Sequence, residues 1–451
     1  MTLWSSADAE SATLGKASKP FAVTGLSIDT RTLKEGDLFV ALQGDNRDGH
    51  AFVKAAFEAK AAAALVTHAP DGVKGALLTV AHTQRGLEDL ARAARARSNA
   101  KVIAVTGSAG KTTTKEILAR CCNALGVTHA SAASHNNHWG VPLSLAALPQ
   151  QAEYGVFEVG MNHFGELRNL VGFVKPHLAL ITTIAPAHLE FFGTCAAIAD
   201  AKSEIFEGLL PGGFALIPAD NEYAQRLTAR ARQAHVSNIV SFGEKGDARL
   251  LSFAAEGDGM RVKADILGRA VDCFVGAPGA HIAQNVVAAL AAVSLLDGDV
   301  LNAAAALRDF TALKGRGARF EAGGIHVIDE SYNANPASMA AALALLGAAS
   351  GRKIAVLGDM LEMGEGGKAH HAGLALPIED NKVDLVFACG EQMRALWDAL
   401  PGPLRGGYAE NSMALAPQLL SSLKDGDTVL VKGSNGAKMS LIIDALKKKA
   451  N

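Results

Sequence analysis

The chain has 451 residues, a formal net charge of −2 at pH 7, 49% apolar residues and 5% aromatic residues. This length predicts about three domains of about 150 residues each, and the near-neutral charge excludes the electrostatic attraction that nucleic-acid binding needs. The five cysteines are odd in number and lack C-x-x-C spacing, which indicates reduced thiols rather than disulfides or a zinc site. The N-terminus carries acids where a signal peptide carries bases, and no apolar run is long enough to cross a bilayer. The sequence therefore predicts a cytoplasmic protein with no nucleic-acid partner and no membrane insertion.

Residues 1–85 predict a small α/β domain. Strands are expected over residues 37–42 and 63–66, with an alanine-rich helix over residues 52–60 between them, so the βαβ alternation is visible. A helical run over residues 87–97 follows, and its charges are typical of a solvated face. We place the first domain boundary between the two segments.

Two polar stretches, residues 27–31 and 43–50, interrupt this first domain. Together they offer hydroxyl groups, an arginine fork and backbone amides, which would suit an anionic sugar nucleotide. The alternative is a pair of solvated turns, with aspartate and glycine present for turn chemistry. The residues of the first stretch that would bind such a substrate are Ser27, Asp29, Thr30 and Arg31.

The strongest motif opens the second predicted domain, residues 86–313. A β-branched strand over residues 101–105 leads without a spacer into a glycine loop, and a helix is expected over residues 113–122. Backbone N–H groups of such a loop can wrap phosphates, and the helix N-terminus adds the positive end of its dipole. The candidate phosphate-binding residues are Thr106, Gly107, Ser108, Ala109, Gly110, Lys111, Thr112 and Thr113.

Two side chains of this loop carry specific chemistry. Lys111 would neutralise the outer phosphates, and the hydroxyl of Thr112 would bind Mg²⁺. Only two residues separate Gly107 from Gly110, where the usual loop has four, which favours a family with the shortened G-x-x-G-K-T loop over a nucleotide switch or motor. The alternative is a glycine-rich turn that binds no ligand.

Three further side chains of the second domain are candidates for metal binding. Glu158 lies near the end of a predicted strand over residues 154–161, where it would be either a Mg²⁺ ligand or an edge-strand carboxylate facing water. His188 follows the next predicted strand, and such a lone histidine is more often structural or solvated. Lys202 lies on an amphipathic helix over residues 198–208, and its neighbours alone indicate a surface lysine.

Polar residues elsewhere in this domain could contact a substrate. Asn136 and Asn137 lie in a polar loop over residues 134–142 and could bind substrate or cap the helix that follows. His281 and Asn285 are four residues apart, so on a helix they share one face and can point at one object such as an adenine ring. Helix capping and core packing remain the local alternatives for this pair.

Residues 314–451 predict a third domain. Strands expected over residues 325–328, 354–357, 385–389 and 428–431 alternate with helices, which gives a doubly wound, Rossmann-like sheet. No G-x-G-x-x-G follows the first strand, which argues against a dinucleotide cofactor and favours a domain that closes over the central nucleotide. The polar residues of its first loops are Arg316, Asp329, Asn333 and Asn335.

Taken in order, these stretches resemble the Mur ligase family, the amino-acid-adding ligases of peptidoglycan synthesis. The resemblance extends over all three predicted domains. Its motifs are D-T-R, G-D-L-F-V-A-L, D-G-H-x-F, G-x-x-G-K-T, N-N-x-x-G-x-P, E-V-G-M-N, A-H-L-E, A-K-S-E-I, G-A-H-x-x-x-N, G-R, D-E-S-Y-N-A-N-P-x-S, L-G-D-M-x-E-M-G and V-K-G-S.

The resemblance implies an ATP-dependent ligase, monomeric and cytoplasmic, that adds D-alanyl-D-alanine to UDP-N-acetylmuramoyl-tripeptide through an acyl phosphate. In this family the lysine matching Lys202 is carbamylated by CO₂ and, with the residue matching His188, binds a second Mg²⁺. The positions matching Thr112 and Glu158 hold the first Mg²⁺. Activity of this kind serves cell-wall biogenesis, and with it cell shape and division.

The resemblance also suggests roles for the remaining candidates. His281 and Asn285 match positions near the adenine, Arg316 matches an arginine that reaches the outer phosphate, and Asp329 matches a residue of the interdomain nucleotide site. The first polar stretch, with Ser27 and residues 29–31, matches the region that receives the UDP-sugar.

Two departures and two alternatives accompany this interpretation. Ser108 and Ala109 stand where many members carry Thr-Asn, although only backbone amides are needed there. The N-P-R motif for a diaminopimelate acceptor is absent, and Asn333 and Asn335 occupy the comparable region, which favours the dipeptide-adding branch. One alternative is a different amide ligase, either another Mur ligase or a folylpolyglutamate synthase-type ligase, which lacks this N-terminal unit. The other is a nucleotide-regulated binding protein without turnover. The sequence identifies neither the third peptide residue, diaminopimelate or lysine, nor the base that deprotonates the amine.

Overall fold

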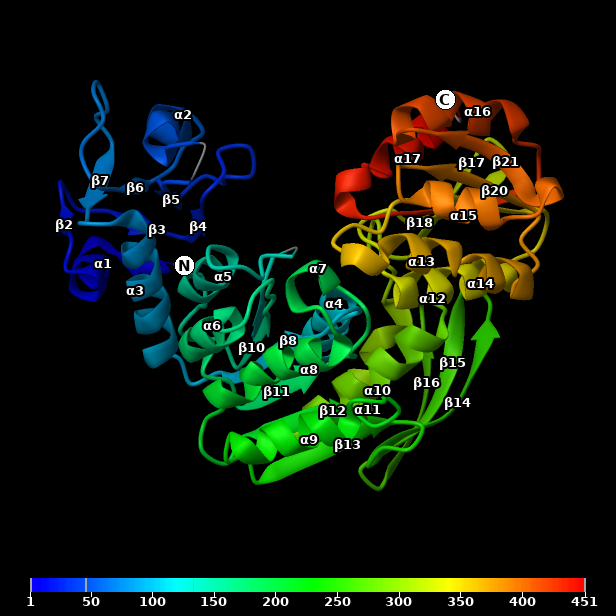
Figure 1. Cartoon of the computed structure of the whole chain (residues 1–451). Helices are drawn as coiled ribbons and strands as arrows, with labels where there is room; N and C mark the ends of the chain where they lie inside the picture. The colour runs from blue at the N-terminus through cyan, green and yellow to red at the C-terminus, as the bar shows by residue number, and fades with distance from the viewer. Residues whose placement is uncertain (1, 45–46, 133, 450–451) are drawn as a thin grey trace.

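The computed structural model describes residues 2–44, 47–132 and 134–449. In this part of the chain, three α/β units follow one another, each built on its own sheet, and the first and third units stand on opposite sides of the central one (Figure 1). The predicted three-domain α/β fold class is confirmed. Asp45 and Asn46, which belong to the second predicted polar stretch, lie outside the described residues.

The N-terminal unit is built on a five-stranded sheet of order β2-β7-β6-β5-β4. Its strands are β2 (Lys16–Ala17), β4 (Gly25–Ser27), β5 (Asp37–Val40), β6 (Ala63–Val66) and β7 (Ala76–Thr79). Strands β4 to β7 are parallel, and β2 pairs antiparallel with β7. The remaining elements are α1 (Ser6–Thr13), α2 (Val53–Glu58), α3 (Thr83–Ala96) and the strand pair β1 (Trp4–Ser5) and β3 (Ala22–Val23).

Helix α3 joins the N-terminal unit to the central one. It packs against α5 (Gly140–Ala146) of the central unit. The guanidinium of Arg97 lies 3.7 Å from the ring centre of Trp4, and the indole N–H of Trp4 donates to the carbonyl of Ala146 at 2.9 Å. The first strand is therefore tied to the central unit, and the predicted boundary at residue 85 falls inside α3.

The central unit is built on a nine-stranded sheet of order β16-β15-β14-β13-β12-β11-β8-β10-β9. Its strands are β8 (Lys101–Thr106), β9 (Thr128–Ala130), β10 (Tyr154–Glu158), β11 (Leu178–Ile181), β12 (Phe214–Pro218), β13 (Asn238–Gly243), β14 (Ala248–Glu256), β15 (Gly259–Ile266) and β16 (Arg269–Val275). Strands β8 to β13 are parallel, and β14 to β16 form an antiparallel meander. Strand β8 lies between β10 and β11, so the loops after these three strands meet at one edge.

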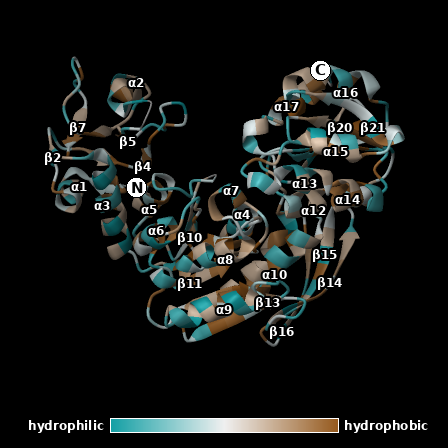
Figure 2. Ribbon diagram, in the orientation of Figure 1, coloured by the Kyte–Doolittle hydropathy of each residue, from teal (hydrophilic) through white to brown (hydrophobic). Residues whose placement is uncertain are grey.

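Helices cover both faces of this sheet. They are α4 (Lys111–Asn123), α5, α6 (Glu166–Val174), α7 (Leu189–Phe192), α8 (Cys195–Ser203), α9 (Ala224–Gln233), α10 (Ala280–Leu295) and α11 (Val300–Ala305). Hydrophobic residues concentrate on the strands, and the outward face of α9 is hydrophilic (Figure 2). Helix α9 was not predicted from the sequence, and its buried side chains are Leu227 and Ala231. This narrow stripe, four residues apart, is easily missed in a polar segment.

The C-terminal unit has a six-stranded sheet of order β17-β18-β22-β19-β20-β21. Its strands are β17 (Ala318–Ala322), β18 (Ile325–Glu330), β19 (Lys353–Gly358), β20 (Leu385–Cys389), β21 (Arg405–Ala409) and β22 (Thr428–Lys432). All are parallel except β17, and helices α12 (Pro336–Gly347), α13 (Gly367–Ala372), α14 (Ala375–Asp380), α15 (Met393–Ala399), α16 (Ser412–Ser422) and α17 (Ser440–Lys449) cover the faces. The edge strands β17 and β21 were not predicted.

The three sheets lie within residues 16–79, 101–275 and 318–432. Each range falls inside one predicted domain, and the domain boundaries themselves stay predictions. Within the described residues, no helix has both the length and the apolar character needed to span a membrane.

Candidate active site

The predicted glycine loop joins strand β8 to helix α4. Gly107 has a φ of +151°, and a Cβ placed on it would lie 1.8 Å from the Oγ1 of Thr182. Gly110 has a φ of +80° and directly precedes α4. Only glycine fits both the backbone conformation and the available space at position 107. The chain can therefore turn directly from β8 into α4, and the N-terminus of α4 faces the loop.

Among the described residues, the buried hydroxyl oxygens of Thr106 and Ser108 in this loop have no hydrogen-bond partner. The same holds for the amide nitrogen of Asn285 on α10, which would lie 3.3 Å from a Cβ on Gly110. Unpaired buried polar atoms are costly, so a cluster of them marks a place where a polar ligand would complete the bonding. The backbone N–H groups of this loop were predicted to bind phosphate. The N–H of Ser108 instead donates to the carbonyl of Thr183 at 2.9 Å.

Gly107 provides the first testable prediction. Gly107→Ala should lower ATP affinity at least about tenfold, because its methyl group collides with Thr182 and displaces the loop. The measurement is ATP binding by calorimetry. Gly212→Ala is the matched control, since Gly212 also has positive φ (+79°) but a Cβ there meets nothing within 4 Å. The control should lose about 1 kcal/mol of stability and keep its ATP affinity; equal affinity in both variants would contradict the loop assignment.

Glu158 lies at the carboxyl end of β10, beside the loop. Its side chain is 1% exposed, and it accepts hydrogen bonds from the hydroxyl of Thr112 and the amide of Asn136, both at 2.7 Å. Strand β10 lies between β8 and β9, so the alternative of a water-facing edge glutamate is wrong. The two predicted ligands of the first Mg²⁺ therefore lie in contact, and both supply the oxygen atoms that this ion prefers.

Two lysines belong to this site, half-buried Lys111 and fully buried Lys202. Lys111 donates to the carbonyl of Gly107 at 2.7 Å. Burial lowers the pKa of Lys111, and nearby Glu158 opposes that shift. Lys202, on α8, is 1% exposed, and burial followed by the charge of Lys111 lowers its pKa well below the usual range. The alternative of a surface lysine is wrong for Lys202.

The amine of Lys202 fits a carbamate. Among the described residues, no hydrogen bond or ion pair of its ammonium group is found. A neutral, buried amine without a carboxylate partner is a nucleophile toward CO₂, whereas a solvated ammonium is not. In the same described ranges, no group of three or more His, Cys, Asp or Glu side chains could hold a metal ion. A second ion would therefore need oxygen ligands from outside these side chains, such as a carbamate and phosphates.

His188 precedes α7 and lines the same cavity as Lys202. Its ring contacts Glu362 of the C-terminal unit, and this hydrogen bond lowers the pKa of Glu362. His281 and Asn285 lie in the first two turns of α10. Gly279 occupies the N-cap position, so neither residue caps the helix. Burial lowers the pKa of His281 and favours its neutral ring.

The C-terminal unit contributes residues from the loop before β17 and from the loop after β18. Arg316 donates to the hydroxyl of Ser134 at 3.1 Å, and its guanidinium lies 3.9 Å from the ring centre of Tyr332. Asn335 caps α12 and donates from its amide to the carbonyl of Ser108 at 3.2 Å. These bonds join the C-terminal unit to the phosphate loop.

Asp329 does not line the cavity. Its carboxylate is 1% exposed and accepts hydrogen bonds from the N–H of Gly315 (3.0 Å) and from the N–H and hydroxyl of Ser331 (3.1 and 2.6 Å). The structure thus shows Asp329 holding the loop that carries Arg316. Its predicted nucleotide contact stays a prediction.

A cavity of about 410 Å³ between the central and C-terminal units brings these residues together. Of the predicted site residues it is lined by Ser108, Ala109, Gly110, Lys111, Thr113, Asn136, Glu158, His188, Lys202, His281, Asn285, Arg316, Asn333 and Asn335. Sequence reasoning missed the buried pair of Lys432 and Glu330, 3.1 Å apart, which lines it as well. The signal was present in the V-K-G-S motif at the end of β22, where a lysine ends a buried strand.

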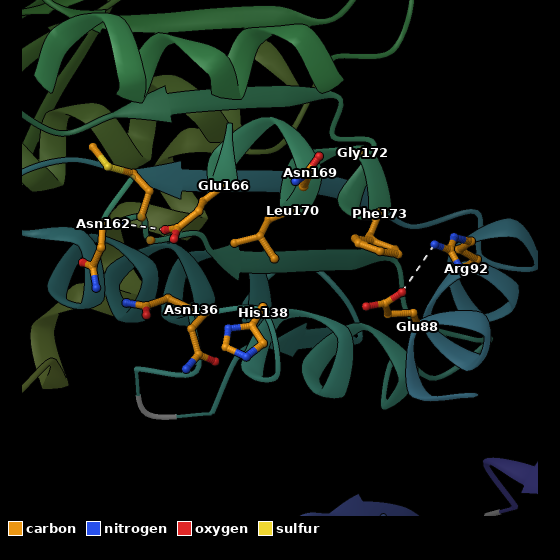
Figure 3. Close-up of a pocket in the computed structure, with 13 residues that line it drawn as sticks. Glu88, Arg92, Asn136, His138, Asn162, Glu166, Asn169, Leu170, Gly172 and Phe173 are labelled. Atoms are coloured by element: carbon orange, nitrogen blue, oxygen red, sulfur yellow. Dashed lines mark hydrogen bonds and ion pairs between the residues drawn. The ribbon is translucent and has the colours of Figure 1, made fainter. Parts of the chain in front are cut away.

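A second cavity, of about 820 Å³, lies beside the first, along α6 and the loop before α5 (Figure 3). Asn136 and residues 160–162 line both cavities, so the two are direct neighbours. Asn137, His138, Glu166 and Asn169 give the second cavity a polar lining.

The candidates of the N-terminal unit line neither cavity. Ser27 donates to the carbonyl of Asp29 at 2.9 Å, and Arg31 binds the carboxylate of Asp29 through two nitrogens. This contact lowers the pKa of Asp29 to about 2. The stretch containing Thr30 therefore forms a self-bonded turn, and the predicted substrate contact stays a prediction.

The site has a phosphate-binding type of loop at the carboxyl edge of a parallel sheet. A second α/β unit covers this loop across a cavity that contains buried lysines. These features define a P-loop enzyme in which a second domain covers the nucleotide site. The family model "Mur ligase middle domain" matches residues 105–293, "Mur ligase, glutamate ligase domain" matches residues 315–435, and "Mur ligase family, catalytic domain" matches residues 22–131. The chain belongs to the Mur ligase family.

Relatives match almost the whole chain. The UDP-N-acetylmuramoyl-tripeptide--D-alanyl-D-alanine ligase of Rickettsia prowazekii is 33% identical and covers 93% of this chain and 94% of its own. A crystal structure of MurF from Acinetobacter baumannii matches with a TM-score of 0.87 at 30% identity and covers 99% of both chains. Folylpolyglutamate synthase of Mycobacterium tuberculosis, complexed with ADP, has a TM-score of 0.64 at 18% identity and covers 79% of this chain. The last likeness concerns the fold alone.

Proposed function

We propose that this chain joins D-alanyl-D-alanine to UDP-N-acetylmuramoyl-tripeptide at the expense of ATP, giving UDP-N-acetylmuramoyl-pentapeptide, ADP and phosphate in peptidoglycan synthesis. The observation that carries the proposal is the match across all three units to ligases named for this reaction. The fold of folylpolyglutamate synthase covers only 79% of the chain. This smaller coverage favours the muramoyl-peptide substrate over folate.

The residues of the 410 Å³ cavity supply what phosphoryl transfer needs. The terminal carboxylate of the tripeptide attacks the γ-phosphorus of ATP, and an acyl phosphate forms as ADP leaves. Lys111 and Arg316 approach from different units and neutralise the charge that spreads over the phosphoryl oxygens. His281 and Asn285 on α10 would receive the adenine, close to the loop, since a Cβ on Gly110 would lie 3.3 Å from the Asn285 amide.

Mg²⁺ fits the oxygen atoms present, and it would neutralise phosphate charge when bound. Thr112 and Glu158 would hold one ion, and His188 with a carbamate on Lys202 would hold the second. The hydroxyl of Thr112 donates a hydrogen bond to the carboxylate of Glu158 at 2.7 Å, so the two oxygen ligands already lie side by side. A carbamate would turn the buried amine of Lys202 into an anionic oxygen ligand, whose negative charge would attract nearby Lys111 instead of disfavouring it.

The second half-reaction requires that water is excluded from the active site. The amine of D-alanyl-D-alanine attacks the acyl phosphate carbon, a tetrahedral intermediate forms, and phosphate leaves as the amide bond closes. The acyl phosphate would hydrolyse in an open site, so the contacts of Asn335 and Arg316 with the central unit have a chemical purpose. The polar 820 Å³ cavity is where we place the peptide stem, because it shares Asn136 and residues 160–162 with the lining of the ATP cavity.

The cellular setting follows from this reaction. We infer a cytoplasmic monomer whose partners are its small-molecule substrates, and whose product serves cell-wall biogenesis, cell shape and cell division. The substrates are hydrophilic nucleotide-linked peptides, and the formal net charge of −2 offers no attraction to nucleic acid.

A paired-substrate assay tests the proposal. ADP release and ligated product are measured together, with UDP-N-acetylmuramoyl-tripeptide plus D-alanyl-D-alanine in one series and folate plus glutamate in the other. Stoichiometric ADP and pentapeptide are expected in the first series alone. ADP release with the folate pair, or none with the muramoyl pair, would contradict the proposal. Tripeptides ending in diaminopimelate and in lysine are compared in parallel to identify the third residue.

A further inference from the structure

The loop that carries His188 is joined to the C-terminal unit by two bonds. The Nδ1 of His188 lies 2.5 Å from the Oε2 of Glu362, and the N–H of Glu190 donates to the carbonyl of Glu362 at 3.1 Å. Glu362 belongs to the loop after β19, which is 174 residues away along the chain. The two loops therefore meet through both a side chain and a backbone.

Both residues of this contact have unusual backbones. His188 has a φ of +58° and Glu362 a φ of +61°, in the left-handed region that costs free energy for residues other than glycine. Gly364, two residues further, packs with its Cα region against Glu190. Both partners of this hydrogen bond thus have a left-handed backbone conformation, which indicates that the folds of both units maintain the contact.

The chemistry of the two groups fixes the histidine tautomer. An ionised carboxylate can only accept hydrogen bonds, so the Nδ1 of His188 must carry the proton that Glu362 binds. The lone pair is then on Nε2, the nitrogen left for a ligand, and the ring lines the cavity with Lys202 and Glu158. Metal-binding histidines commonly have such a carboxylate on the second nitrogen, which orients the ring and raises its basicity.

We propose that Glu362 is a positioning residue for His188: it holds Nδ1 protonated and presents Nε2 to the cavity only when the C-terminal unit is docked on the central one. This inference rests on the proposed function, in which His188 binds the second Mg²⁺. Docking then completes the metal site as well as covering the nucleotide. Acyl phosphate formation is thereby restricted to the closed, water-free arrangement.

Three variants separate this role from a simple latch. Glu362→Ala removes the contact. Glu362→Gln keeps its size but can donate as well as accept, so it no longer dictates the tautomer. Glu365→Ala is the matched control, because Glu365 is an exposed glutamate three residues further along the same segment.

The first measurement is the tautomer of His188, by ¹⁵N NMR of histidine-labelled protein with a non-hydrolysable ATP analogue and Mg²⁺. His188→Gln identifies the signal by its loss. We expect the Nδ1–H form in the unmodified chain and in Glu365→Ala, and a mixture of both forms in Glu362→Ala and Glu362→Gln. An unchanged tautomer in the Gln variant would overturn the proposal.

The second measurement is binding of Mn²⁺, as a paramagnetic substitute for Mg²⁺, to the complex with the same analogue. We expect the weaker of two sites to lose about 10- to 100-fold affinity in both Glu362 variants and to be unchanged in Glu365→Ala. Equal Mn²⁺ affinity in all three would overturn the proposal. Failure of the unmodified chain to release ADP with the muramoyl pair would instead contradict the proposed function, while the tautomer would still decide the role of Glu362.

Discussion

Lys111→Ala is expected to release ADP at least about 10³-fold more slowly than the unmodified chain, which makes its activity indistinguishable from background. Lys111 is the half-buried cation next to the glycine loop, and its charge opposes the charge that develops on the phosphoryl oxygens. Arg316, a cation that the C-terminal unit contributes, is bonded to Ser134 and stacked on Tyr332, which holds it in its own position. The measurement is ADP release with UDP-N-acetylmuramoyl-tripeptide and D-alanyl-D-alanine at saturation.

Stability provides the control for this variant. Burial lowers the pKa of Lys111, so the charged side chain costs folding free energy and its removal should not lower the melting temperature. Lys245→Ala, at an exposed lysine remote from the cavity, should keep both activity and stability. Full ADP release by a folded Lys111→Ala protein would refute the assignment of the phosphate loop.

Most of what could be predicted about the fold came from local patterns in the sequence. The strand before the phosphate loop, the glycines and the helix after it are consecutive in sequence, so their geometry depends on neighbours. Glu158 also followed from a local rule, because a carboxylate at the end of a buried strand must meet a partner. Helix α9 was missed because only Leu227 and Ala231 of its ten residues are buried, too few for a periodic signal.

What could not be predicted depends on contacts between distant segments. Lys202 has the sequence environment of a surface lysine, and only the packing of α8 beneath the site buries it. The partner of His188 is 174 residues away, so no spacing rule connects the two. Asp329 accepts hydrogen bonds from Gly315, 14 residues away, and from Ser331, and the sequence did not indicate the first of these contacts. Resemblance to a family supplied roles for these residues, whereas their surroundings came only from the folded chain.

Lys202→Ala is the second variant with a large expected effect. Its rate of ADP formation should fall by about 10³-fold, because the alanine cannot carry the carbamate that would supply an oxygen ligand. Truncation leaves a space beside Lys111 and Glu158 that a small carboxylic acid can enter. Formate, acetate or propionate at high concentration should therefore restore part of the rate, and activity is measured across a series of acids of increasing size.

Rescue distinguishes a carbamate from an ordinary buried lysine. A lysine that acted by its positive charge would be rescued by small amines, whereas a carbamate is replaced by an anion, so the class of the rescuing molecule identifies the charge of the missing group. Labelling with ¹³CO₂ should also give a carbamate ¹³C signal in the unmodified chain that is absent from Lys202→Ala. A near-normal rate without added acid, or rescue by amines alone, would eliminate the carbamate. The signal should persist in Lys245→Ala, because only a buried neutral amine is held ready for CO₂.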